Sequence, residues 1–295
     1  MAAKNRNEES YLKKVVASVF NQFIYGGHLL AVGLACVVVL AAVLMRLEVT
    51  FDLVLVIYFF TLGAALFGRY IDIKKDLLTN PERSKYLNKQ IRTTPFIITF
   101  CVVLALMILV LNNKFEIIFF CLVMLLFSLF YDLFLKKLTK KILGFKNIYI
   151  GILFSLLILI PMLYYNFKLG VPFALVVIFV FIMTFTGTAF SDVKDIEADT
   201  RDNLKTYAVV LGHKKLIILL SVIRLFALVP ICIGVYLGMF PVYAFMLAFI
   251  VPWSIFLFWE SFKSDIKVDL LYGFLFDSEF IVWLLLVLVG KELMP

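Results

Sequence analysis

Charged residues are scarce in this chain. Asp, Glu, Lys and Arg make up only 16% of its 295 residues, whereas the apolar set AVILMFWYC makes up 64%, and the mean hydropathy is +1.05. Because a soluble domain is about one quarter charged and about half apolar, this composition excludes a soluble enzyme. It also excludes a disordered chain, which would be rich in charge and poor in apolar residues.

Cysteine and histidine are also few, with four and two copies. All four cysteines fall inside apolar runs and lack the paired spacing of a zinc site or a disulfide framework. The N-terminal residues carry acids as well as bases and show no small-residue cleavage site, so a removable signal peptide is not predicted. The first apolar run is therefore expected to remain in the protein.

What the chain does contain is a series of apolar runs of roughly 20 residues, the length at which a helix crosses a bilayer. These runs are too long and too continuous for the strands of a membrane barrel. We predict an all-α polytopic membrane protein, with an interfacial segment at 1–21 and one nine-helix bundle over 22–295. The nine predicted spans are 22–45, 51–68, 95–111, 116–135, 147–165, 171–190, 216–237, 241–259 and 270–289.

The distribution of basic residues predicts the orientation, because Lys and Arg in short loops stay cytoplasmic. Arg224 lies inside the seventh run, and only Arg46, Lys114, Lys168 and Lys291 fall on the side opposite the N-terminus. The rest of the 28 Lys and Arg lie on the N-terminal side. We therefore predict a multi-pass protein of the cell membrane with its N-terminus cytoplasmic and its C-terminus outside. The net charge of +8 then faces the cytoplasm and requires no nucleic-acid partner.

Acidic residues gather at two helix ends on the predicted cytoplasmic side. Asp72 and Asp76 are four residues apart after the second run, and Asp192, Asp195 and Asp199 follow the sixth run with helical spacing. Crowded carboxylates repel one another unless a cation neutralises them, and Mg²⁺ prefers oxygen ligands. The pattern favours a Mg²⁺ site over acids that merely alternate with bases in solvated loops.

Basic residues accompany the acids, as a metal-bound diphosphate would require. They include Arg69 and Arg83 near the first cluster, Lys205 near the second, and Lys136 at the end of the fourth run. Most of the aromatic side chains are expected to pack against lipid or to line an apolar tunnel.

These motifs resemble the signatures of the UbiA superfamily of intramembrane prenyltransferases. The matching segments are Asp72-xxx-Asp76 with Asn80-Pro81-Glu82-Arg83, then Tyr131 to Lys136 with Gly144 and Asn147, and then Asp192-xx-Asp195-xxx-Asp199 with Lys205-Thr206 and Leu211-Gly212. The resemblance covers essentially the whole chain. One departure is Gly68, which stands four residues before Asp72, where the family usually has Asn.

The resemblance implies transfer of a prenyl chain from an isoprenyl diphosphate, such as geranyl or geranylgeranyl diphosphate, to a lipophilic acceptor in the bilayer. The five aspartates of the two motifs would bind Mg²⁺, with Asp72 and Asp195 essential for catalysis. Arg69, Arg83, Lys136 and Lys205 would bind the diphosphate, and Tyr131 would close the site near the reacting carbon. The acceptor stays open among an aromatic quinone precursor, a haem or chlorin, and an ether-lipid glycerophosphate precursor.

Three polar residues lie inside the predicted spans, where such groups usually face the bundle interior. His28 is a candidate for the substrate cavity or for a structural hydrogen bond. Arg224 and Asp277 are expected to form a structural ion pair. A proton or ion pathway through them would instead make the protein a secondary transporter, and a lipid-embedded scaffold is the third alternative.

Overall fold

The computed structural model describes residues 18–73, 77, 80–263, 272, 274, 275 and 277–294, without the side chains of residues 132, 133 and 136. Regular structure in these residues is helical, which confirms the predicted all-α class. The elements after the first helix, Ser18–Tyr25, are α2 His28–Leu44, α3 Phe51–Asp72, α5 Pro81–Lys89, α6 Thr94–Leu111, α7 Phe115–Leu133, η1 Leu135–Lys140, α8 Phe145–Leu156, α9 Leu159–Tyr164, α10 Val171–Ser191, η2 Asp192–Asp195, α11 Ile196–Arg201, α12 Tyr207–Leu225, α13 Leu228–Tyr236, η3 Val242–Phe249, α14 Ile250–Glu260 and α15 Glu279–Leu293.

Helices of the described residues match the predicted spans in position but not all in length. Six are long and apolar enough to cross a membrane, and a seventh is counted if the bent pair Ser18–Tyr25 and His28–Leu44 is one span. The other two predicted spans correspond to α7, whose apolar part is shorter, and to α15, which has 15 residues. The count of nine and the orientation of the termini stay predictions.

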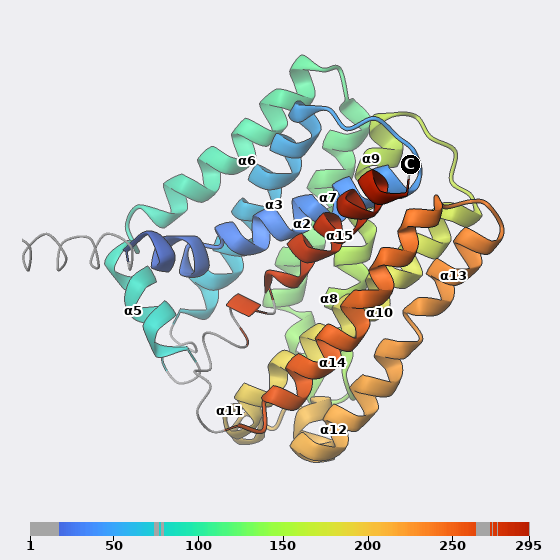
Figure 1. Cartoon of the computed structure of the whole chain (residues 1–295). Helices are drawn as coiled ribbons and strands as arrows, with labels where there is room; N and C mark the ends of the chain where they lie inside the picture. Colours follow the sequence, from blue (N-terminus) through green and yellow to red (C-terminus); the bar gives the residue numbers. More distant parts are fainter. Residues whose placement is uncertain are drawn as a thin grey trace, which may run out of the picture.

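The long helices form a closed ring. Going around it, α15 packs on α2, α2 on α3, α3 on α6 and α6 on α7 (Figure 1). α7 contacts α9, which continues the span of α8, and α8 packs on α10 and α10 on α12. The segment η3–α14 then contacts both α12 and α15, which closes the ring. As a result, the C-terminal helix lies directly beside the N-terminal one.

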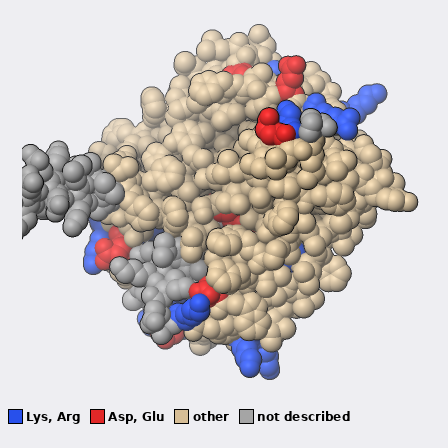
Figure 2. Space-filling view, viewed as in Figure 1, with Lys and Arg blue, Asp and Glu red and all other residues tan. Residues whose placement is uncertain are grey.

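The outer surface of the bundle is apolar. Figure 2 shows a broad face almost free of Lys, Arg, Asp and Glu, with charged side chains gathered toward two opposite ends. Large apolar side chains are exposed on the bundle, among them Phe96 at 77% and Phe119 at 71%. An apolar surface of this extent is stable only in a lipid environment. The protein is therefore a multi-pass membrane protein.

A sharp bend separates the first helix from α2. The two helices meet at 54°, and Gly27 between them has a φ of +84°, which suits glycine. Arg69 of α3 donates from Nη1 to the carbonyls of Ile24 and Tyr25, at 2.8 and 2.9 Å, and so satisfies the last carbonyls of the first helix. The bend places Ile24 and Tyr25 against the cavity described next.

Candidate active site

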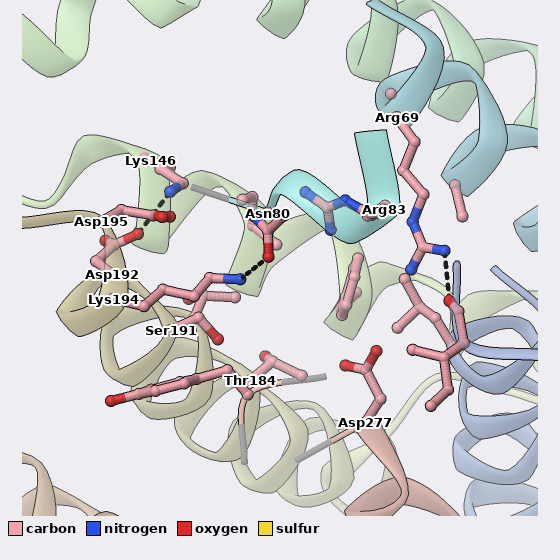
Figure 3. Close-up of a pocket in the computed structure, with 18 of the residues that line it drawn as sticks. Arg69, Asn80, Arg83, Lys146, Thr184, Ser191, Asp192, Lys194, Asp195 and Asp277 are labelled. Atoms are coloured by element: carbon pink, nitrogen blue, oxygen red, sulfur yellow. Dashed lines mark hydrogen bonds and ion pairs between the residues drawn. The ribbon is translucent and has the colours of Figure 1, made fainter. Parts of the chain in front are cut away.

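A cavity of about 380 Å³ opens at the end of the bundle where α3, α5, α8 and α10 meet the segment before α15 (Figure 3). Its lining carries both signs of charge together with the hydroxyls of Thr184, Thr188 and Ser191. The charged lining residues are Arg69, Arg83, Lys146, Asp192, Lys194, Asp195 and Asp277.

Asp192 is the most enclosed of the acidic groups that line the cavity, with 1% exposure. Its Oδ1 accepts from Lys146 Nζ at 2.5 Å and its Oδ2 from Asn147 Nδ2 at 2.9 Å. Both donors stand in the first turn of α8, which begins after Gly144 at a φ of +65°. The buried carboxylate therefore fixes a lysine at the edge of the cavity, where a charge-assisted hydrogen bond is strong.

The other cations come from three separate elements. Lys194 in η2 donates to Asn80 Oδ1 at 3.1 Å, which joins the second acidic motif to the start of α5. Arg83 enters from α5, and Arg69 enters from α3 while holding the bend. Figure 3 shows these groups on one side of the cavity, an arrangement suited to an anion with several oxygens.

Asp277 lines the same cavity, and this corrects the predicted pairing of Asp277 with Arg224. The charged groups that face it are Arg69, Lys194 and Arg83. Its carboxylate points into the space bounded by Arg69, Arg83 and Thr184 (Figure 3).

Arg224 instead pairs with Glu279. Its Nη2 lies 2.5 and 2.7 Å from the two carboxylate oxygens of Glu279, and its Nη1 donates to Thr186 Oγ1 and to the carbonyl of Met183. Ser254 also hydrogen-bonds Glu279. Glu279 stands two residues after Asp277, and because the chain enters α15 at this point, Glu279 rather than Asp277 faces the arginine.

A second, apolar pocket of about 170 Å³ adjoins the charged cavity. The two share the lining residues Leu30, Ala64, Ala65 and Phe154, so they lie side by side. The apolar pocket lies between α2, α3, α7 and α8, and Leu34, Phe60, Met124 and Leu157 are among its walls. A polar head would therefore sit beside a lipophilic tail.

A family model described as the UbiA prenyltransferase family matches residues 29–276 of this chain. The chain belongs to the UbiA prenyltransferase family. It is therefore an intramembrane prenyltransferase, which moves a prenyl chain from an isoprenyl diphosphate to a lipophilic acceptor.

Two solved structures share the UbiA fold. The chain is similar to the apo structure of a UbiA homolog from Aeropyrum pernix K1, at 14% identity and a TM-score of 0.68, over 90% of this chain and 97% of the other. It is also similar to a digeranylgeranylglyceryl phosphate synthase, at 16% identity and a TM-score of 0.58, over 93% and 100% of the two chains. None of the curated proteins matches this sequence.

The UbiA motifs predicted from the sequence fall only partly on the cavity. Arg69, Arg83, Asp192 and Asp195 line it. The predicted metal ligand Asp76 lies outside the described residues, as does the side chain of Lys136.

The other predicted site residues are not among those that line the cavity. Asp72 is half-buried at the end of α3, and Asp199 is buried in α11. His28 Nδ1 hydrogen-bonds Tyr58 OH at 2.7 Å, in agreement with the structural hydrogen bond considered for His28 from the sequence. Tyr131 stacks on Tyr149, with 4.9 Å between the ring centroids. Lys205 has an exposed side chain, and its backbone pairs with Thr139 and Gly144.

Sequence reasoning does not assign Lys146 or Asp277 to the site. Lys146 counts there as one of the cytoplasmic lysines, although its position beside Asn147 of the UbiA motif is a usable signal. Lys194 is one of the basic residues that the sequence places next to the second acidic cluster, and it lines the cavity. Nothing in the sequence connects Asp277 with the motifs, because the fold alone brings α15 to α2.

The described residues fit Mg²⁺ only as an ion shared with substrate. No three His, Cys, Asp or Glu of the described ranges lie close enough together to hold a metal by themselves. Mg²⁺ in phosphate-transfer sites needs only one or two carboxylates, with waters and phosphate oxygens completing its shell. Asp195, which lines the cavity among the cations, can serve as such a ligand.

Proposed function

We propose that this protein catalyses Mg²⁺-dependent transfer of a prenyl chain from an isoprenyl diphosphate to a lipophilic acceptor, with the diphosphate in the charged cavity. The observation that carries the proposal is the junction of that cavity with an apolar pocket through four shared residues. This arrangement suits a substrate with a highly charged head and a hydrocarbon tail.

Three cationic side chains from different elements would bind the diphosphate together. Lys146 of α8 is fixed by Asp192, Lys194 of η2 is fixed by Asn80, and Arg83 adds a guanidinium from α5. Because these groups are held by partners before substrate arrives, little reorganisation accompanies binding. Bound Mg²⁺ would supply further neutralisation of the leaving diphosphate.

The apolar pocket would hold the prenyl chain. Each CH₂ removed from water there contributes about 0.8 kcal/mol. The walls formed by Leu30 and Phe154 also keep water from an allylic cation formed near the junction. We propose geranyl or geranylgeranyl diphosphate as donor substrates, because their chains would extend from the charged cavity into this pocket.

The acceptor is proposed to be an aromatic quinone precursor or a related lipid precursor. The likeness in fold to a digeranylgeranylglyceryl phosphate synthase supports including a glyceryl phosphate ether lipid among the acceptors tested. The transporter alternative was based on an ion pathway through Arg224 and Asp277. Arg224 instead forms a buried ion pair with Glu279, which removes that argument.

The test is to incubate purified protein in nanodiscs with radiolabelled geranylgeranyl diphosphate, with Mg²⁺ or EDTA, and with a panel of quinone-precursor, haem and glyceryl phosphate acceptors. We expect Mg²⁺-dependent formation of one prenylated product. Asp195→Asn should abolish transfer, whereas the matched variant Asp202→Asn, at an exposed residue outside the cavity, should retain it. Full activity of Asp195→Asn in EDTA would refute the metal role.

A further inference from the structure

Asp277 is an acidic residue of the cavity to which the proposed function assigns neither a binding nor a catalytic role. It belongs to none of the sequence motifs, yet its carboxylate points into the cavity (Figure 3). Within the part of the chain that the structure describes, the carboxylate has neither a hydrogen-bond nor an ion-pair partner. A half-buried carboxylate in this situation costs free energy, which is expected at a functional site.

The position of Asp277 is fixed from two directions. Two residues later, Glu279 is held by Arg224 and Ser254 inside the bundle. On the other side, α2 approaches so closely that a Cβ added at Gly33 would lie 3.2 Å from the carbonyl oxygen of Asp277 and 3.1 Å from Cβ of Phe280. The carboxylate is therefore presented by a rigid support, as a reacting group requires.

The surroundings of Asp277 change when a diphosphate is bound. The charged groups that face it are Arg69 from α3, Arg83 from α5 and Lys194 from η2. Arg83 and Lys194 are assigned to the diphosphate, whose negative charge would offset theirs. Of the three carboxylates that line the cavity, Asp192 is engaged by Lys146 and Asn147 and Asp195 is proposed as a Mg²⁺ ligand, so Asp277 is the one left to accept a proton.

We propose that Asp277 is a catalytic residue that accepts the proton released by the acceptor during prenyl transfer, an inference that rests on the proposed function. The bond between the prenyl C1 and the diphosphate oxygen breaks, and its electron pair leaves with the diphosphate. C1 forms a bond to the hydroxyl oxygen or aromatic carbon of the acceptor. The proton lost by that atom moves to the Asp277 carboxylate and leaves to water as the product departs.

The experiment compares Asp277→Asn with wild type and with Asp202→Asn in nanodiscs, using geranylgeranyl diphosphate and the acceptor that wild type uses. We expect Asp277→Asn to lower kcat by about 100-fold or more, the usual loss on removing a general base. The KM for geranylgeranyl diphosphate should be unchanged, as should binding of geranylgeranyl thiolodiphosphate, which ionises poorly. Asp202→Asn should match wild type in every respect.

The dependence of kcat on pH distinguishes a proton acceptor from a residue with a purely structural role, because only the former changes the shape of the profile. Wild-type kcat should fall on the acid side as Asp277 becomes protonated, and Asp277→Asn should lose this acid limb. Asp277→Glu keeps an ionisable group and should retain the limb at reduced kcat, which decides the question if the Asn variant does not fold.

Three results would overturn the inference. The first is wild-type kcat in Asp277→Asn, and the second is loss of thiolodiphosphate binding in the folded variant, which would make Asp277 a binding residue. Both leave the proposed function intact. The third is absence of prenyl transfer in wild type, which refutes the proposed function and the inference together.

Discussion

The buried ion pair between Arg224 and Glu279 permits a quantitative test. The two side chains are 0% and 1% exposed, and they join α12 to the first turn of α15. Replacing either partner leaves the other charge buried and unpaired, which typically costs about 3–5 kcal/mol. We expect Arg224→Met and Glu279→Leu each to lower the unfolding midpoint by about 6–10 °C, at roughly 2 °C per kcal/mol for a chain of this size.

The double variant Arg224→Met/Glu279→Leu should recover most of this loss, because it removes both charges and leaves apolar groups of similar volume. The assay is thermal unfolding of purified protein in one detergent, followed by intrinsic fluorescence, with the four proteins arranged as a double-mutant cycle. Additive losses in the double variant would refute the reasoning, since independent effects carry no pairwise coupling. Wild-type stability of either single variant would refute it equally.

Three further predictions follow from other features. Gly144→Ala should lower stability and transfer, because its Cβ would clash with the Tyr207 ring and the residue has a φ of +65°; circular dichroism melting and the transfer assay measure the two effects. Ala64→Phe should fill the junction of the two pockets and shift preference toward shorter prenyl diphosphates, so an unchanged preference in competition assays would contradict the tunnel. In sealed cells whose protein lacks the native cysteines, an impermeant thiol reagent should label Lys114→Cys and miss Lys205→Cys; labelling at Lys205→Cys would reverse the orientation.

The helices and part of the site could be predicted because their signals are local. Apolar runs of spanning length predicted where each helix lies, and the spacing of Asp192 and Asp195 placed both on the polar end of α10. The limits of the helices were less predictable. At the bend around Gly27, the carbonyl of Ile24 accepts a hydrogen bond from Arg69 of α3, and hydropathy contains no information about such a contact.

The remaining site residues could not be predicted, because they are brought together by packing between distant segments. Asp277 and Glu279 are both acids near the start of the last helix, and only the direction of the chain into α15 decides which of them meets Arg224. From the sequence alone, Lys146 is indistinguishable from the loop lysines that keep a segment cytoplasmic. Its role in the site depends on the packing of α8 on α10, which brings it to Asp192.

The ion pair between α12 and α15 also has a consequence for biosynthesis. Glu279 is synthesised 55 residues after Arg224, so α12 enters the membrane before its counter-charge exists. An arginine near the centre of an inserting helix costs about 2.5–3.5 kcal/mol on translocon scales. That cost is offset only once the last helix has inserted, so a chain that ends before Glu279 would carry an uncompensated arginine in the bilayer.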